Sequence, residues 1–97
     1  MFFGHDDRTI HFTFAPSVPN EQVQDTLTLS SMAAETLFGA ERVTLEAQAE
    51  FDAKARQVRV RAETEVGRAM ASMFLGFIWR EFGAGAVTIR RGEGGGQ

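Results

Sequence analysis

The stretch that most limits the fold is Ala69–Trp79, AMASMFLGFIW, which carries no charge and lies between Arg68 and Arg80. It is well short of the roughly 20 apolar residues that a membrane-spanning helix needs. On a helix of about 3.6 residues per turn, its large side chains cover two sides instead of one stripe. We therefore expect a helix that packs against its own chain on one side and against a second surface on the other.

The composition narrows the class of protein. The chain has 97 residues, a net charge of -3, 24 % charged residues and no cysteine. This length allows one folded domain with a small core. The negative charge argues against an overall surface for nucleic acid, and the lack of cysteine excludes disulfides, thiolate metal sites and cysteine nucleophiles. No secretory signal is visible after Met1, so we expect a cytoplasmic protein.

Four segments alternate between apolar and polar residues, which is typical of strands with one wet face. They are Thr9–Ala15, Arg42–Phe51, Gln57–Glu63 and Ala86–Arg91. The second and third are joined by the polar turn Asp52–Arg56, which predicts a hairpin. The polar side chains of these segments would share one face of the sheet: Thr9, His11, Thr13, Glu46, Gln48, Glu50, Arg59, Arg61, Glu63, Thr88 and Arg90.

The register of this hairpin follows from the alternation. With Phe51 opposite Val58, Glu50 faces Arg59 across the two strands. Such opposite-charge pairs are each worth about 0.2–1 kcal/mol. The outer face would therefore be solvated and internally charge-paired.

A first helix is expected after the two prolines of the Ala15–Asn20 loop, with Ser17 or Val18 near its start. It would end at Phe38, because Gly39 can take the left-handed conformation that closes a helix. Its inward positions would be Val23, Leu27, Ala34, Leu37 and Phe38.

The second helix contains the uncharged stretch. Thr64 or Glu63 would cap it, and it would run through Val66 to about Phe82 before the glycines that follow. On this helix, Met70, Met73, Phe74 and Phe77 are expected in the core.

The order strand, helix, strand, strand, helix, strand is that of the split βαβ, ferredoxin-like fold. We therefore expect an α+β two-layer sandwich (βαββαβ) with a four-stranded antiparallel sheet and two helices on one face. Residues 1–91 would form one domain. The glycine-rich residues 92–97 would form a flexible tail.

The sequence supports neither an RNA-recognition domain nor an enzyme class. The sheet face lacks the aromatic side chains on which RNA-recognition domains stack bases. The carboxylates lie on wet surfaces and no serine has a histidine in register, so general acid–base and nucleophilic catalysis have no visible basis. His5, Asp6, Asp7 and His11 do not have the spacing of a metal motif, and we expect solvated side chains and no cofactor. Two points are left open: whether the first loop binds a small ligand, and whether these four residues nevertheless bind a metal.

The remaining feature is the outer side of the second helix. The first helix offers too little apolar surface to cover four side chains of the second helix: Leu75, Ile78, Trp79 and Phe82. Such a patch on a monomer is unusual, and tryptophan is enriched at interface hot spots. We therefore expect a non-enzymatic interaction or assembly module that binds another protein or, most simply, a second copy of itself.

The alternative is a nucleic-acid-associated or small-ligand regulatory domain. It would act through the arginines of the sheet face or through the first loop. The arginines concerned are Arg56, Arg59, Arg61, Arg90 and Arg91. The net charge makes nucleic acid the weaker partner.

Overall fold

The structure, a computed structural model of the whole chain, describes residues 8–92. Four strands, three α-helices and a short 3-10 helix follow one another along the chain: β1 (Thr9–Phe14), α1 (Asn20–Phe38), α2 (Ala40–Glu46), β2 (Ala49–Asp52), β3 (Gln57–Arg61), α3 (Glu65–Phe82), η1 (Ala84–Ala86) and β4 (Val87–Arg91). The α+β class is confirmed. Residues 8–92 contain three α-helices where two were predicted.

The sheet is antiparallel, with the strand order β2-β3-β1-β4. The predicted hairpin register is confirmed, since Phe51 lies opposite Val58 and Glu50 lies opposite Arg59. The central strand β1 pairs with β3 on one side and with β4 on the other. Strands β2 and β4 therefore form the two edges.

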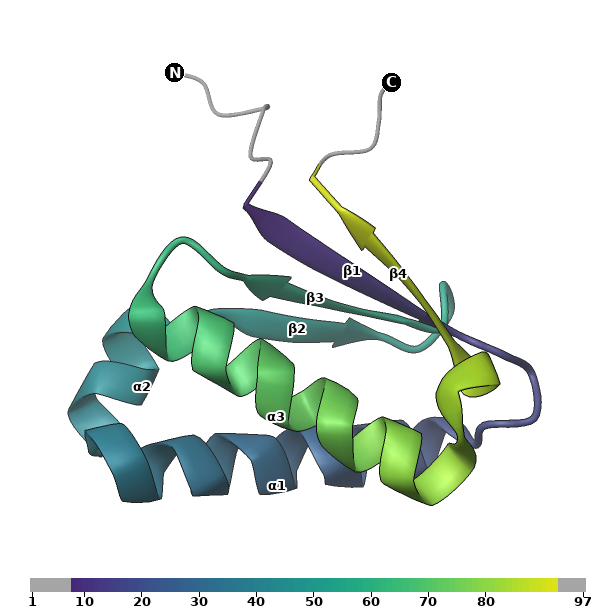
Figure 1. Cartoon of the computed structure of the whole chain (residues 1–97), viewed down its shortest axis with the longest axis horizontal. Coiled ribbons are helices and arrows are strands. Elements are labelled where there is room, and N and C mark those ends of the chain that lie inside the picture. Colours follow the sequence, from purple (N-terminus) through teal and green to yellow (C-terminus); the bar gives the residue numbers. More distant parts are fainter. Residues whose placement is uncertain (1–7, 93–97) are drawn as a thin grey trace.

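The core lies between the sheet and the long helices α1 and α3, which run side by side beneath it (Figure 1). Phe74 of α3 is fully buried and meets the rings of Phe12 and Phe14 edge-on, with centroids 5.2 and 5.9 Å apart. From α1 come mainly small or branched side chains: Val23, Leu27, Ser30 and Ala34. Since α1 contributes so little bulk, α3 supplies most of the core volume of the helical layer.

The predicted strand Arg42–Phe51 is wrong in its first half, which forms helix α2 instead. Val43 and Ala47 are four residues apart, so they lie on the same side of a helix as well as of a strand. Val43 is buried, but Leu45 is 76 % exposed, which the strand pattern did not allow. Glu46 consequently belongs to α2 and not to the polar face of the sheet.

The start of α1 also differs from the prediction. Pro19 is the N-cap residue and no side chain caps the helix, whereas Ser17 lies outside it and Val18 is buried in the core. At the other end, Gly39 has φ 92° and its N–H donates to the carbonyl of Glu35, as the predicted end requires. Leu37, placed inward by the sequence, is 69 % exposed because it lies on the outer side of the last turn.

The N-terminus of α3 is closely packed. Thr64 caps the helix, as predicted, by accepting a hydrogen bond from the N–H of Gly67 (2.9 Å). Its hydroxyl also donates to the carbonyl of Glu46 at the end of α2 (2.8 Å). A Cβ atom on Gly67 would lie 2.1 Å from the carbonyl oxygen of Arg61, so only glycine fits here. This junction joins α2, β3 and α3.

Arg56 ties the turn of the hairpin to the first loop. Its Nη1 donates to Oδ1 of Asn20 (3.0 Å), and its Nη2 donates to the carbonyls of Ala15 (2.7 Å) and Val18. The residue has φ 55°, in the left-handed region. Two carbonyls of the first loop therefore accept hydrogen bonds from this arginine.

The start of β1 and the end of β4 lie side by side in the sheet. The N–H of Gly92 donates to the carbonyl of Thr9 (2.7 Å), so the first residue of the predicted tail is fixed to the sheet. The rest of that tail, and His5, Asp6 and Asp7, lie outside the described residues. Between residues 8 and 92, no helix combines the length and the hydropathy needed to cross a bilayer.

Candidate functional site

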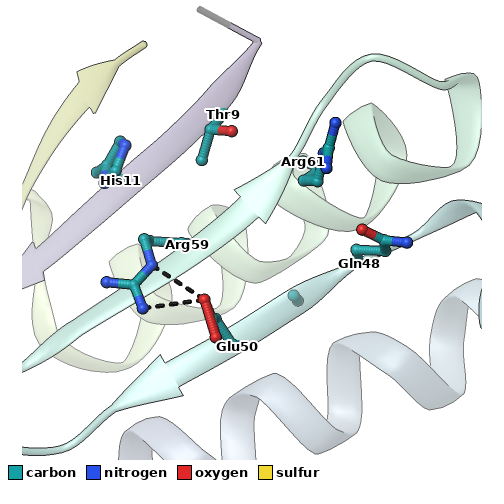
Figure 2. Close-up of a pocket in the computed structure, with 7 residues that line it drawn as sticks. Thr9, His11, Gln48, Glu50, Arg59 and Arg61 are labelled. Atoms are coloured by element: carbon teal, nitrogen blue, oxygen red, sulfur yellow. Dashed lines mark hydrogen bonds and ion pairs between the residues drawn. The ribbon is translucent and has the colours of Figure 1, made fainter. Parts of the chain in front are cut away.

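Apart from Glu46, which belongs to α2, the polar residues that line the open face of the sheet are ones that the alternation placed there. A hollow of about 520 Å³ lies on it and is lined by Thr9, His11, Gln48, Ala49, Glu50, Arg59 and Arg61. Figure 2 shows the six polar side chains around this hollow, contributed by β1, β3 and the β2 side of the sheet. The hollow is shallow and polar, and its floor is the sheet itself.

Its arginines are already paired within the chain. Nε and Nη2 of Arg59 donate to Oε2 of Glu50 at 3.2 and 2.9 Å (Figure 2). Its Nη1 donates to Oε1 of Gln57. Nη2 of Arg61 donates to Oε2 of Glu63 (3.0 Å). These pairs neutralise the charge that would attract a phosphate backbone, which weakens the case for nucleic acid on this face.

His11 lies between two arginines, opposite Arg59 on β3 and Arg90 on β4. Its Nδ1 is 3.5 Å from Oε1 of Gln57, and its Nε2 is shielded from solvent without a partner in the described chain. The described residues contain no group of three or more carboxylates and histidines that could hold a metal ion.

The arginines predicted to act together do not share one surface. Arg90 lies on the open face beside His11, whereas Arg91 points to the helical side and lines a groove there. Adjacent residues of a strand face opposite ways, and the sequence prediction overlooked this for Arg90 and Arg91. Arg56 is occupied by the first loop, so it takes no part in either surface.

One pair of ionisable groups on α2 has shifted acidity. A two-pronged hydrogen bond from Arg42 to Glu46 (3.1 and 3.0 Å) holds the pKa of the Glu46 carboxyl below its ordinary value. The same bond raises the pKa of Arg42. Both side chains are partly exposed to solvent, and the pair acts as an i,i+4 support for a short helix.

The four apolar side chains predicted for an interface are separated by the structure. Ile78 is fully buried in the core, so the prediction is wrong for this residue. Leu75 and Phe82 are half-buried against the core, and Trp79 is 44 % exposed. The first helix was expected to leave all four uncovered, but the core reaches Ile78 because it lies on the same side of α3 as Phe74.

A groove runs between α3 and the edge strand β4, and Leu75 lines it. It measures about 200 Å³ and is lined mainly by apolar groups: Ile10, Phe12, Arg68, Ala71, Ser72, Leu75, Ile89 and Arg91. Ile89 is 43 % exposed although it points to the helical side. Helix α3 therefore leaves the β4 edge of the sandwich partly uncovered. We call the surface formed by Leu75, Trp79, Phe82 and Ile89 the α3–β4 flank.

The sequence did not identify Ile89 as a flank residue, because its alternation marked it only as inward. It also missed further exposed apolar side chains on α1 and α2: Leu29, Met32, Leu37 and Leu45. Those on α1 stand among exposed threonines and acidic residues, and single exposed apolar residues are normal on a folded protein. Met32 also lines a groove, of about 380 Å³, but half of that lining is polar, with Gln24, Thr28, Ser31 and Glu35 among it. The groove beside the flank differs because its lining is mainly apolar and includes the core residue Phe12.

Comparisons with protein-family models, with curated proteins and with solved structures found no match to this chain. What the chain does must therefore be inferred from its own geometry.

Proposed function

We propose that the chain is a non-enzymatic protein-interaction module that associates with a second copy of itself through the α3–β4 flank. The observation that carries the proposal is the exposure of Ile89 in an apolar groove at a sheet edge, together with exposed Trp79 one helical turn beyond the groove residue Leu75. Burying such surface stabilises an association by about 25 cal/mol for each Å² of apolar area removed from water. A symmetric dimer covers the flank of both copies at once.

The fold supports this use of the flank. We infer a ferredoxin-like arrangement, supported by the strand order β2-β3-β1-β4 and by α1 and α3 lying beneath the sheet, with α2 as an addition. In such a sandwich, two helices must cover four strands. Here β4 is covered least, since four of its five residues are exposed, whereas the other edge strand, β2, has one exposed residue. The expected cytoplasmic location stays a prediction.

The proposal is tested by the mass of the full chain in solution. Sedimentation velocity over a range of protein concentrations should show a dimer for the natural sequence. The substitution Trp79→Ala should shift the equilibrium towards monomer by at least tenfold in the dissociation constant, because it removes the largest exposed side chain of the flank.

The matched control is Leu45→Ala. Leu45 is more exposed than Trp79 but lies on α2, away from the flank, so this variant should keep the mass of the natural chain. A natural chain that stays monomeric at all concentrations, or a dimer that Trp79→Ala leaves unchanged, would contradict the proposal.

A further inference from the structure

The exposed side of α3 carries an ordered stripe of four side chains: Arg68, Ser72, Leu75 and Trp79. Their spacing of i, i+4, i+7 and i+11 places them in one line along the helix. At about 1.5 Å per residue, Arg68 and Trp79 are about 16 Å apart at its two ends. A cation thus stands at the start of the stripe and an aromatic ring at its end.

The environment of these side chains leaves the stripe available. Arg68, Ser72 and Trp79 are exposed and Leu75 is half-buried. Nη1 of Arg68 makes one long hydrogen bond, to the carbonyl of Ala62 (3.4 Å), and no carboxylate between residues 8 and 92 forms an ion pair with it. Arg68, Ser72 and Leu75 also line the groove beside β4.

The stripe of one copy matches the stripe of a second copy that runs in the opposite direction. In an antiparallel pair of α3 helices, the alignment that sets Arg68 opposite Trp79 of the second copy also sets Ser72 opposite Leu75 of the second copy. Both pairs share one centre, midway between residues 72 and 75. A guanidinium on the face of an indole is attractive, and a large side chain opposite a small one lets two helices approach.

From this self-complementarity we propose that the occupant of the flank is a second copy of this chain. In this dimer, α3 packs antiparallel on its counterpart and Arg68 of each copy lies on Trp79 of the other. The proposal rests on the proposed function and adds to it the alignment of the two helices and the residue pair that selects it. Ile89, next to Leu75 across the groove, would extend the apolar contact.

The other symmetric arrangement, in which two β4 edges pair, is disfavoured by charge. The bonds from Ala15 N to Ala86 O and from Gly92 N to Thr9 O leave the backbone groups of alternate β4 residues, Ile89 among them, on the open edge. However, β4 carries Arg90 and Arg91 and no acidic residue. Two such strands side by side would gather four arginines, which is the charged protection that sheet edges use against self-pairing.

The test mixes two variants that each lack one half of the contact. Trp79→Ala and Arg68→Ala homodimers both have no arginine–tryptophan contact, whereas the mixed dimer keeps one. Native mass spectrometry resolves the three dimers because the variants differ in mass. We expect the mixed dimer to exceed about half of all dimers, the proportion that random pairing gives. Its dissociation constant should be at least tenfold lower than that of either variant alone.

The matched control replaces Arg68→Ala with Arg80→Ala, which removes an exposed arginine of α3 outside the stripe. Mixed with Trp79→Ala, this variant should show no excess of mixed dimer. Random pairing of the Arg68 and Trp79 variants would overturn the proposed alignment. If the natural chain still dimerises through Trp79 in that case, the proposed function survives; if it does not dimerise at all, both fail.

Discussion

The two ends of α3 are built on opposite principles. At its start, the backbone is closely packed: the Thr64 hydroxyl bonds to the N–H of Gly67 and to the carbonyl of Glu46 on α2, and Gly67 has no room for a single extra carbon atom. Towards its end, Trp79 projects into solvent, and a Cβ atom on Gly76 would meet nothing within 4 Å. One helix thus has a closed end that fixes the fold and an open end that leaves surface uncovered.

This difference separates residues that stabilise the domain from residues that are available to a partner. Substitutions at the closed end and at other fitted positions should cost free energy of unfolding. Substitutions at the open end should cost association and little else. The four predictions below test this division, from the largest expected effect on the domain to the smallest.

The largest effect is expected for Gly67→Ala. The new methyl group would overlap the carbonyl oxygen of Arg61, and the backbone of β3 or α3 must shift to admit it. We expect a loss of about 3 kcal/mol in the free energy of unfolding, measured by urea denaturation. The same change at Gly76 should stabilise the chain by up to about 1 kcal/mol, since alanine favours a helix and the site is open. Equal effects at the two glycines would refute the contrast between the two ends.

A second fitted position is Arg56. Replacing it with alanine removes the charged hydrogen bonds to Asn20 and to the carbonyls of Ala15 and Val18. The expected loss is about 2 kcal/mol in the free energy of unfolding, because bonds from a charged donor are worth more than neutral ones. Lys54→Ala, in the same turn but exposed, serves as the control. A loss no larger than that of the control would show that the clamp on the first loop does not stabilise the fold.

At the open end, Trp79→Ala should change the free energy of unfolding of the monomer by no more than about 0.5 kcal/mol. The measurement is made at a protein concentration below the dissociation constant of the dimer, so that association does not contribute. Its neighbour Ile78, fully buried, provides the contrast: Ile78→Ala should cost about 3 kcal/mol. A large loss for Trp79→Ala would mean that the indole belongs to the core and not to an interface.

The smallest effect concerns acidity on α2. Because the pKa of Glu46 is lowered in the folded chain, its bond to Arg42 stabilises the fold above the pKa of the unfolded glutamate. This contribution is lost as the pH falls through the lower, folded pKa. Titration followed by NMR should show the Glu46 carboxyl moving back towards the ordinary glutamate pKa in Arg42→Gln. No movement would show that the pair is not formed in solution.

Much of the sheet could be predicted from the sequence because alternation of apolar and polar residues reports directly on burial. The hairpin register followed from one assumption, Phe51 opposite Val58, and it is correct. Helix α2 was missed because Val43 and Ala47 satisfy the periods of both a strand and a helix. A signal that could have indicated the helix is the spacing of Arg42 and Glu46, four residues apart, which form an ion pair in the structure.

The candidate surface was only partly predictable. Trp79 and Leu75 could be selected because the helix has more large apolar residues than one buried face accommodates. Ile78 could not be separated from them without knowing how α3 is rotated on the sheet. The groove at Ile89 depends on how far α3 lies from the β4 edge, which no local pattern encodes. The same holds for Arg90 and Arg91, whose separation onto two faces follows from the strand geometry that the sequence prediction left aside.

The hydrogen bond between Gly92 and Thr9 has a further consequence for how this domain can be connected. The described chain begins and ends at adjacent positions of the sheet, with the N–H of Gly92 2.7 Å from the carbonyl oxygen of Thr9. A short peptide joining residues 92 and 8 would close the backbone into a ring, which permits circular permutation. For the same reason, the domain could be inserted into a loop of a host protein, whose chain would leave and return at nearly the same point.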